Sequence, residues 1–208
     1  MRIVKPADER KNEILDVAER LFAEKGFDNA STNDIIKEIG IARGTLYHHF
    51  QSKEEILDAI VDRMTGRGIE RAARIVDDRK KPILVRLIET IGALNLIAEG
   101  KDEVLDEIHK PQNALLHQKM QERLLSGVVP LIAKLVEEGN ESGLFHTPYP
   151  DEAVEMIMTY SGTAFDELAG LSPEEKETKG RAFIFNTERL VGAKEGSLKE
   201  ALAGFFSK

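Results

Sequence analysis

Apolar residues recur every three or four positions along most of the chain, and this spacing predicts a protein built of helices. No stretch alternates apolar and polar residues for long, as a half-buried strand would. The first apolar stripe consists of Ile14, Val17, Ala18, Leu21 and Phe22. Lys25-Gly26, a cation followed by a residue suited to a helix end, closes it. We therefore expect an all-α fold that opens with an amphipathic helix.

A second helix is predicted to start at Ser31, whose hydroxyl can cap it while Asp34 reaches back from three positions further on. A tight turn at residues 40–42 follows, and Leu46 and Phe50, four residues apart, define the buried side of a third helix. Two short helices around a three-residue turn form a helix-turn-helix, here at about residues 31–50.

The exposed face of the third helix combines side chains that suit a DNA major groove. At 100° steps, with the apolar side inward, this face consists of Arg43, Gly44, Thr45, Tyr47 and His48. Hydroxyl and imidazole groups can bond base edges or phosphates, and a glycine lets the backbone approach closely. The geometry alone also allows a solvated face that never touches DNA.

Two helix starts flank this face and favour phosphate groups. Ser52 and Glu55 predict a capping box that opens a fourth helix, whose free N–H groups and Lys53 would attract a phosphate. Ser31 and Thr32 could hold another phosphate at the start of the second helix. These side chains extend the predicted interface beyond the third helix.

The net charge of the whole chain and the local charge around the third helix favour different partners. The chain carries a net charge of −8, and residues 1–55 hold nine basic and eleven acidic residues, which does not favour nucleic acid. The stretch from Lys37 to Lys53, however, contains three basic residues and one acidic residue, which gives it a local charge of +2. A small positive face within an acidic protein is therefore expected.

The stretch AEKGFDNASTNDIIKEIGIARGTLYHHFQSKEEIL, Ala23 to Leu57, resembles the DNA-binding signature of the TetR family of bacterial transcriptional regulators. The likeness is greatest in the core G-T-L-Y-x-H-F-x-S-K-E-E. It implies that Thr45, Tyr47 and His48 touch bases or phosphates. It also implies that Lys53 touches a phosphate, with Ser31, Thr32 and Arg43 assisting. The family often has Lys where this chain has Arg43, and an arginine can bond a guanine edge with two hydrogen bonds.

Residues 1–55 are thus predicted to form the helix-turn-helix DNA-binding domain, and residues 56–208 a helical domain for effector binding and dimerisation. In the second domain, GRGIERAARIVDDRKKP contains Gly66 and Gly68 and is a candidate hinge or solvated connector. Further helices are predicted from Pro82, over 102–109, over 112–138 with a kink at Pro130, and over 151–169.

Two segments, 151–169 and 181–191, carry apolar residues on more than one side and so need two packing partners. One partner can be the domain's own core and the other the same helix of a second chain, giving a four-helix dimer. The resemblance implies the same arrangement, whereas a buried core helix in a monomer is the alternative. We expect a homodimer that reads a near-palindromic operator.

The resemblance also implies a small-molecule effector cavity in the second domain. Candidate lining residues are polar or aromatic groups on helices expected to converge: Asn95, His109, Asn113, His117, Met120, Tyr160, Phe165 and Phe183. Methionine and aromatic residues at helical spacing also build ordinary cores. A metal held by His109 and His117, with Glu107, is a weaker alternative, because two His eight residues apart across Pro111 match no known zinc spacing. We expect no metal or other cofactor.

The composition of the chain excludes several functional classes of protein. The chain has no Cys, which excludes disulfides and thiol nucleophiles. It shows neither a signal peptide nor an apolar run of membrane-spanning length, so a cytoplasmic protein without a membrane partner is expected. No phosphate loop or nucleophile elbow supports an enzyme. A DNA-binding repressor is the leading hypothesis; a helical-bundle enzyme and a protein-binding adaptor are the alternatives, and activation in place of repression stays open.

Overall fold

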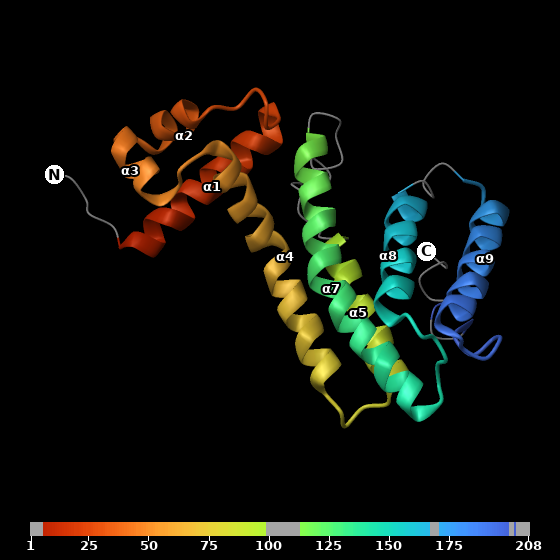
Figure 1. Ribbon diagram of the computed structural model, residues 1–208. Coiled ribbons are helices and arrows are strands. Elements are labelled where there is room, and N and C mark those ends of the chain that lie inside the picture. The colour runs from red at the N-terminus through yellow and green to blue at the C-terminus, as the bar shows by residue number, and fades with distance from the viewer. Residues whose placement is uncertain (1–5, 99–112, 167–170, 200–201, 203–208) are drawn as a thin grey trace. The chain divides into compact units, whose positions relative to one another are not determined.

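The computed structural model describes residues 6–98, 113–166, 171–199 and 202 (Figure 1). This part of the chain consists of eight helices without a strand, which confirms the all-α fold. The helices are α1 (Ala7–Lys25), α2 (Thr32–Ile39), α3 (Arg43–His49), α4 (Lys53–Asp77), α5 (Ile83–Ala98), α7 (Ala114–Ser142), α8 (Pro150–Asp166) and α9 (Pro173–Val191). The short helix predicted over 102–109 lies outside the described residues.

The chain folds into two compact units. The N-terminal unit comprises Met1–Arg67 and Ile97–Arg123, and the C-terminal unit comprises Gly68–Leu96 and Leu124–Lys208. The domain boundary expected after residue 55 stays a prediction. The chain passes between the two units three times, within α4, within α5 and within α7.

The N-terminal unit packs α1, α2, α3 and the first part of α4 around one apolar core (Figure 1). Leu46 and Phe50 are fully buried there, as their spacing predicted, although α3 ends at His49 and Phe50 is its C-cap. Leu116 and Met120 of α7 complete the same core. The third helix is therefore held by its apolar side, which leaves its other side outward.

Helix ends follow the predicted signals closely. Ser31 and Asp34 form a complete capping box on α2, and Gly40 ends that helix in the left-handed conformation, with φ 73° and ψ 33°. At α4 only half of the expected box is present. The Ser52 hydroxyl accepts from the Glu55 amide, but the Glu55 carboxylate accepts from the amide of Gln51, one residue before the predicted partner.

The connector predicted over residues 66–82 is wrong for residues 66–77, because α4 continues as a single helix from Lys53 to Asp77. Beyond the glycines, Ala72 and Val76 are four residues apart and fully buried. An apolar face that stays in register for a further turn outweighs two weak helix formers. The connector therefore consists only of residues 78–82, between α4 and α5.

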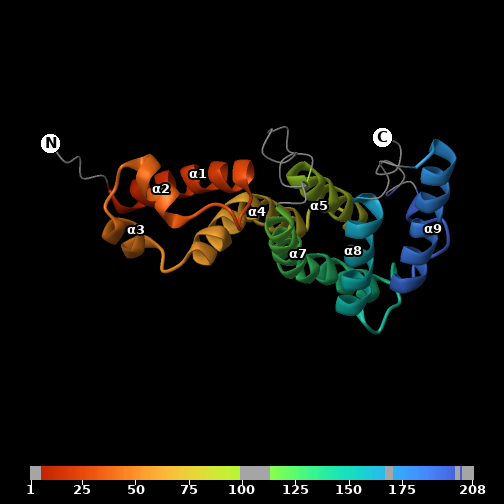
Figure 2. The same ribbon diagram turned by 90° about the horizontal axis from the view of Figure 1, so that it is seen from above.

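In the C-terminal unit, α8 and α9 lie side by side (Figures 1 and 2). Phe145, in the loop after α7, is fully buried, and a Cβ on Gly139 would lie 2.1 Å from its ring. Gly139 therefore provides the space that Phe145 fills. The last helix begins at Pro173, earlier than the 181–191 segment suggested, because Ser172 and Glu175 form another complete capping box. Within the described ranges, no helix is long and apolar enough to cross a membrane.

Candidate nucleic-acid interface

The predicted face of α3 is accessible. Arg43, Gly44 and His48 are exposed, and Thr45 and Tyr47 are half-buried at its edges. The buried Leu46 fixes the rotation of the helix about its own axis. A seven-residue helix with a glycine on its open side is small enough to enter a major groove.

Tyr47 joins the third helix to the second. Its hydroxyl lies 3.3 Å from the Thr32 hydroxyl at the first residue of α2. The guanidinium carbon of Arg43 lies 5.4 Å from the centre of the Tyr47 ring. The hydrogen bond with Thr32, followed by the neighbouring Arg43, lowers the pKa of the Tyr47 phenol. Three of the predicted DNA contacts are thus brought together in one cluster.

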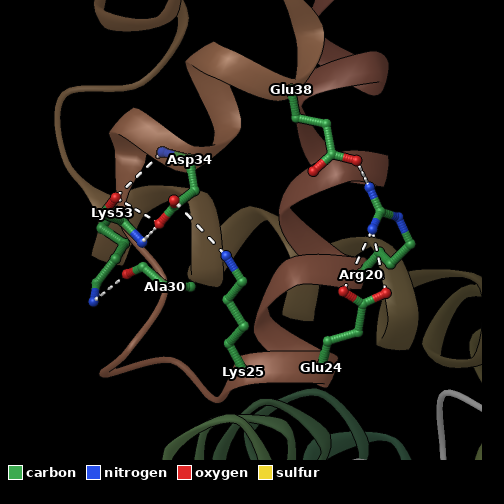
Figure 3. Close-up of polar contacts among 8 residues, drawn as sticks. Arg20, Glu24, Lys25, Ala30, Asp34, Glu38 and Lys53 are labelled. Carbon is green, nitrogen blue, oxygen red and sulfur yellow. Dashed lines mark hydrogen bonds and ion pairs between the residues drawn. The ribbon is translucent and has the colours of Figure 1, made fainter.

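Ser31 is occupied by its own helix. Its hydroxyl accepts from the Asp34 amide at 3.2 Å and donates to the Asp34 carboxylate at 2.7 Å (Figure 3). These contacts with Ser31 are the main reason why the pKa of Asp34 is lowered, and Lys25, whose Nζ lies 3.7 Å from the same side chain, adds to the effect. The Ser31 amide also donates to the Asp34 carboxylate, at 2.9 Å, so both polar groups of Ser31 are used at the start of its own helix.

Lys53, the first residue of α4, reaches back to the loop between α1 and α2. Its ammonium donates to the Phe27 carbonyl at 2.7 Å and to the Ala30 carbonyl at 3.1 Å. Figure 3 draws the contact with Ala30 beside the capping box of α2. The ammonium nitrogen also lies 4.1 Å from the centre of the Phe27 ring. Two of its three N–H groups are thus used within the protein.

A basic cluster at the end of α3 was missed in the sequence. His49 packs against His48, with ring centres 5.3 Å apart. It also interacts electrostatically with Lys11 and Arg10 of α1. Burial and then these cations lower the pKa of His49. Only the packing of α1 against α3 unites these residues, so helical spacing within one segment could not reveal them.

The predicted effector residues do not all fall in one unit. Asn113, His117 and Met120 belong to the N-terminal unit, where Asn113 and Met120 are buried. Tyr160 and Phe183 belong to the C-terminal unit and stack with ring centres 6.2 Å apart. His109 lies outside the described residues, as do the side chains of Asn95 and Phe165. This set of lining residues stays a prediction.

Helices α8 and α9 expose large apolar side chains. Met156 and Tyr160, four residues apart on α8, are 58% and 56% exposed, and Phe185 on α9 is 47% exposed. Arg189, one turn after Phe185, stacks on its ring at 5.1 Å. Large apolar groups that stay this open are typical of surfaces covered by another chain.

Two family models match the chain. The model described as "Bacterial regulatory proteins, tetR family" matches residues 14–60, and "Tetracyclin repressor-like, C-terminal domain" matches residues 97–183. The HTH-type transcriptional repressor KstR2 of Rhodococcus jostii is 40% identical over 112 residues, or 48% of this chain. The matched stretch spans about half, 55%, of that relative's own length.

Solved structures share the fold. SmeT, the repressor of a Stenotrophomonas maltophilia multidrug efflux pump, has 21% identity and a TM-score of 0.64, with 89% of this chain and 91% of SmeT covered. FadR from Bacillus subtilis, solved in complex with stearoyl-CoA, has 23% identity and a TM-score of 0.52, with 75% and 89% covered. These likenesses extend over both compact units.

Proposed function

Because the chain belongs to the tetR family of bacterial regulatory proteins, we propose that it is a cytoplasmic transcriptional repressor that binds a DNA operator through α3. The observation that carries the proposal is the open face of α3, where Arg43, Gly44 and His48 are exposed beside Tyr47. The absence of acidic residues between Ile39 and Lys53 keeps this face compatible with phosphates.

The residues of the interface have different roles in this proposal. Thr45, Tyr47 and His48 contact base edges or phosphates, and Arg43 bonds a phosphate or a guanine edge. Gly44 allows close approach, whereas Ser31 and Thr32 mark the α2 end that faces the DNA backbone. The family resemblance implies a phosphate contact for Lys53 as well, although two of its three N–H groups already donate to carbonyls of the protein.

A homodimer follows from the need for specificity. One short recognition helix reads few base pairs, and two copies related by a twofold axis read a near-palindrome with half-sites roughly 34–36 Å apart. The exposed apolar residues of α8 and α9 support a four-helix interface between two copies.

We further propose that a small molecule releases the repressor from its operator. A ligand that binds better to a conformation with the wrong spacing of recognition helices lowers operator affinity, and DNA lowers ligand affinity by the same factor. KstR2 is named a repressor and FadR was crystallised with stearoyl-CoA. Acyl-CoA thioesters are therefore the first effectors to test. None of these roles requires a catalytic group or a cofactor.

The proposal is tested by selecting duplexes from a random pool with the purified protein and measuring affinity for the selected site. Tyr47→Ala should weaken binding at least tenfold without changing the oligomeric state, because it removes one contact and the link to Thr32. Asn12→Ala, on the exposed side of α1, is the control. A pool that yields no preferred sequence at low salt would refute the proposed function.

A further inference from the structure

Lys53 connects the start of α4 with the loop between α1 and α2. It opens α4, yet its ammonium ends in the loop between α1 and α2, more than twenty residues earlier in the chain. The side chain is only partly exposed, and its nitrogen lies over the face of the Phe27 ring. These contacts hold the Lys53 side chain in one position. A lysine without such contacts could turn toward a ligand.

The loop carbonyls need this donor. Phe27 and Ala30 are buried residues, and no backbone N–H in the described part of the chain donates to either carbonyl. A buried carbonyl without a donor is costly, and a charged donor makes a stronger hydrogen bond than a neutral one. Lys53 satisfies both carbonyls with one group.

The consequence reaches the DNA-facing residues through a short chain of contacts. Ala30 immediately precedes Ser31, the N-cap of α2, and Thr32 is the first residue of that helix. Thr32 in turn lies within hydrogen-bond distance of Tyr47 on α3. Fixing the Ala30 carbonyl therefore fixes the start of α2 and, through Thr32, the phenol of Tyr47.

Other side-chain contacts between α1 and α2 are weaker. The Lys25–Asp34 pair is long, at 3.7 Å, and both side chains are well exposed, so solvent screens it. Arg20 bonds Glu24 and Glu38 near the other end of α2, again at the surface (Figure 3). Among these ties, only Lys53 bonds the backbone of the loop itself.

We propose that Lys53 is a positioning residue for operator binding, which holds the α1–α2 loop so that Thr32 and Tyr47 meet the duplex in the correct place. This inference rests on the proposed DNA-binding function. It differs from the direct phosphate contact implied by the family resemblance, because the charge of Lys53 would act on the protein's own carbonyls.

The salt dependence of binding separates the two roles. Each phosphate neutralised by a lysine contributes roughly 0.9 to the slope of log affinity against log salt. Lys53→Met keeps most of the side-chain volume against Phe27 but removes the charge and the donors. The positioning role predicts at least tenfold weaker binding at every salt concentration, an unchanged slope, and faster amide hydrogen exchange in residues 27–34.

Two further variants complete the experiment. Ile60→Val, in the fully buried part of α4, should lower the melting temperature of the unit and leave operator affinity as in the wild type. Phe27→Leu keeps the Lys53 charge and removes the ring beneath it, so it should also weaken binding without changing the slope. It serves in place of Lys53→Met if that variant does not fold.

Three results would overturn the inference. A slope reduced by roughly 0.9 in Lys53→Met would show a phosphate contact. Wild-type operator affinity in Lys53→Met would show that Lys53 has no role in binding. Weaker binding with unchanged amide hydrogen exchange in residues 27–34 would show that Lys53 does not act through the α1–α2 loop. If the wild-type protein itself selects no duplex, the proposed function fails before the role of Lys53 is reached.

Discussion

Gly192 follows the last turn of α9 in a left-handed conformation, with φ 64° and ψ 31°. A Cβ at this position would lie 2.3 Å from the carbonyl oxygen of His146, whose amide donates to the Val191 carbonyl. Two separate demands, on conformation and on space, therefore apply to the same residue.

Gly192→Ala should destabilise the C-terminal unit by clearly more than the roughly 1–2 kcal/mol that a left-handed alanine costs. The comparison is Gly143→Ala, which has φ 76° but open space around the missing Cβ and so reports the conformational cost alone. The difference between the two urea-unfolding free energies measures the steric part. Equal values would mean that the His146 loop moves away freely.

His49 makes the stability of the N-terminal unit depend on pH. Its pKa is lowered in the folded chain by burial and by His48, Lys11 and Arg10, so the unfolded chain binds a proton more readily. Its contribution to stability is therefore complete above the unfolded pKa of about 6.5 and falls as the pH decreases below that value.

In His49→Gln, urea unfolding should lose part of its pH dependence between roughly pH 5 and pH 7. His146→Gln, at an exposed position in the C-terminal unit, controls for the removal of an imidazole. A His49→Gln profile that runs parallel to the wild type throughout this range would contradict the assignment.

At the scale of the helices, α9 illustrates what a start signal contributes. Ser172 accepts from the Glu175 amide at 3.3 Å, and the Glu175 carboxylate accepts from the Ser172 amide at 2.8 Å. These contacts with Ser172 also lower the pKa of Glu175. Ser172→Ala should cost about 1 kcal/mol of unfolding free energy.

The matched control for this prediction is Thr178→Ala, at an exposed position inside the same helix, which should be neutral or slightly stabilising because alanine is the better helix former. Denaturation of both variants in urea gives the comparison. If Ser172→Ala unfolds like the wild type, α9 does not depend on its cap.

Local signals were sufficient for much of the fold. The Ser31–Asp34 box, the Gly40 turn and the inward positions of Leu46 and Phe50 were all predicted, since each depends on residues within one turn or two. The continuity of α4 through Gly66 was not, because distant packing along its apolar face decides it. For the same reason the sequence could suggest Lys53 as functional but could not reveal its acceptors at Phe27 and Ala30.

At the scale of the whole molecule, the proposed dimer depends on the exposed apolar side chains of α8 and α9. Phe185→Glu should convert a dimer into monomers in sedimentation experiments, because it removes an apolar contact and buries a carboxylate whose desolvation cost an ion pair with the neighbouring Arg189 does not offset. Operator affinity should then fall by at least tenfold, since each monomer reads one half-site.

Val85→Glu is the control, because it also places a carboxylate at an exposed apolar position of the C-terminal unit, on α5. It should remain dimeric. Dissociation of both variants would indicate general destabilisation, and an unaffected Phe185→Glu dimer would exclude this part of α9 from the interface.

Glu188 of α9, almost fully buried, accepts from the amides of Gly196 and Leu198 at 2.9 and 2.8 Å. The segment after α9 also buries Leu198 and Leu202 in the core of the C-terminal unit. A nonsense mutation ahead of Lys194 would therefore remove both donors and leave a carboxylate stranded in an apolar interior. Such an allele should behave as a null through degradation of the truncated protein, even though every residue of the proposed DNA interface is still encoded.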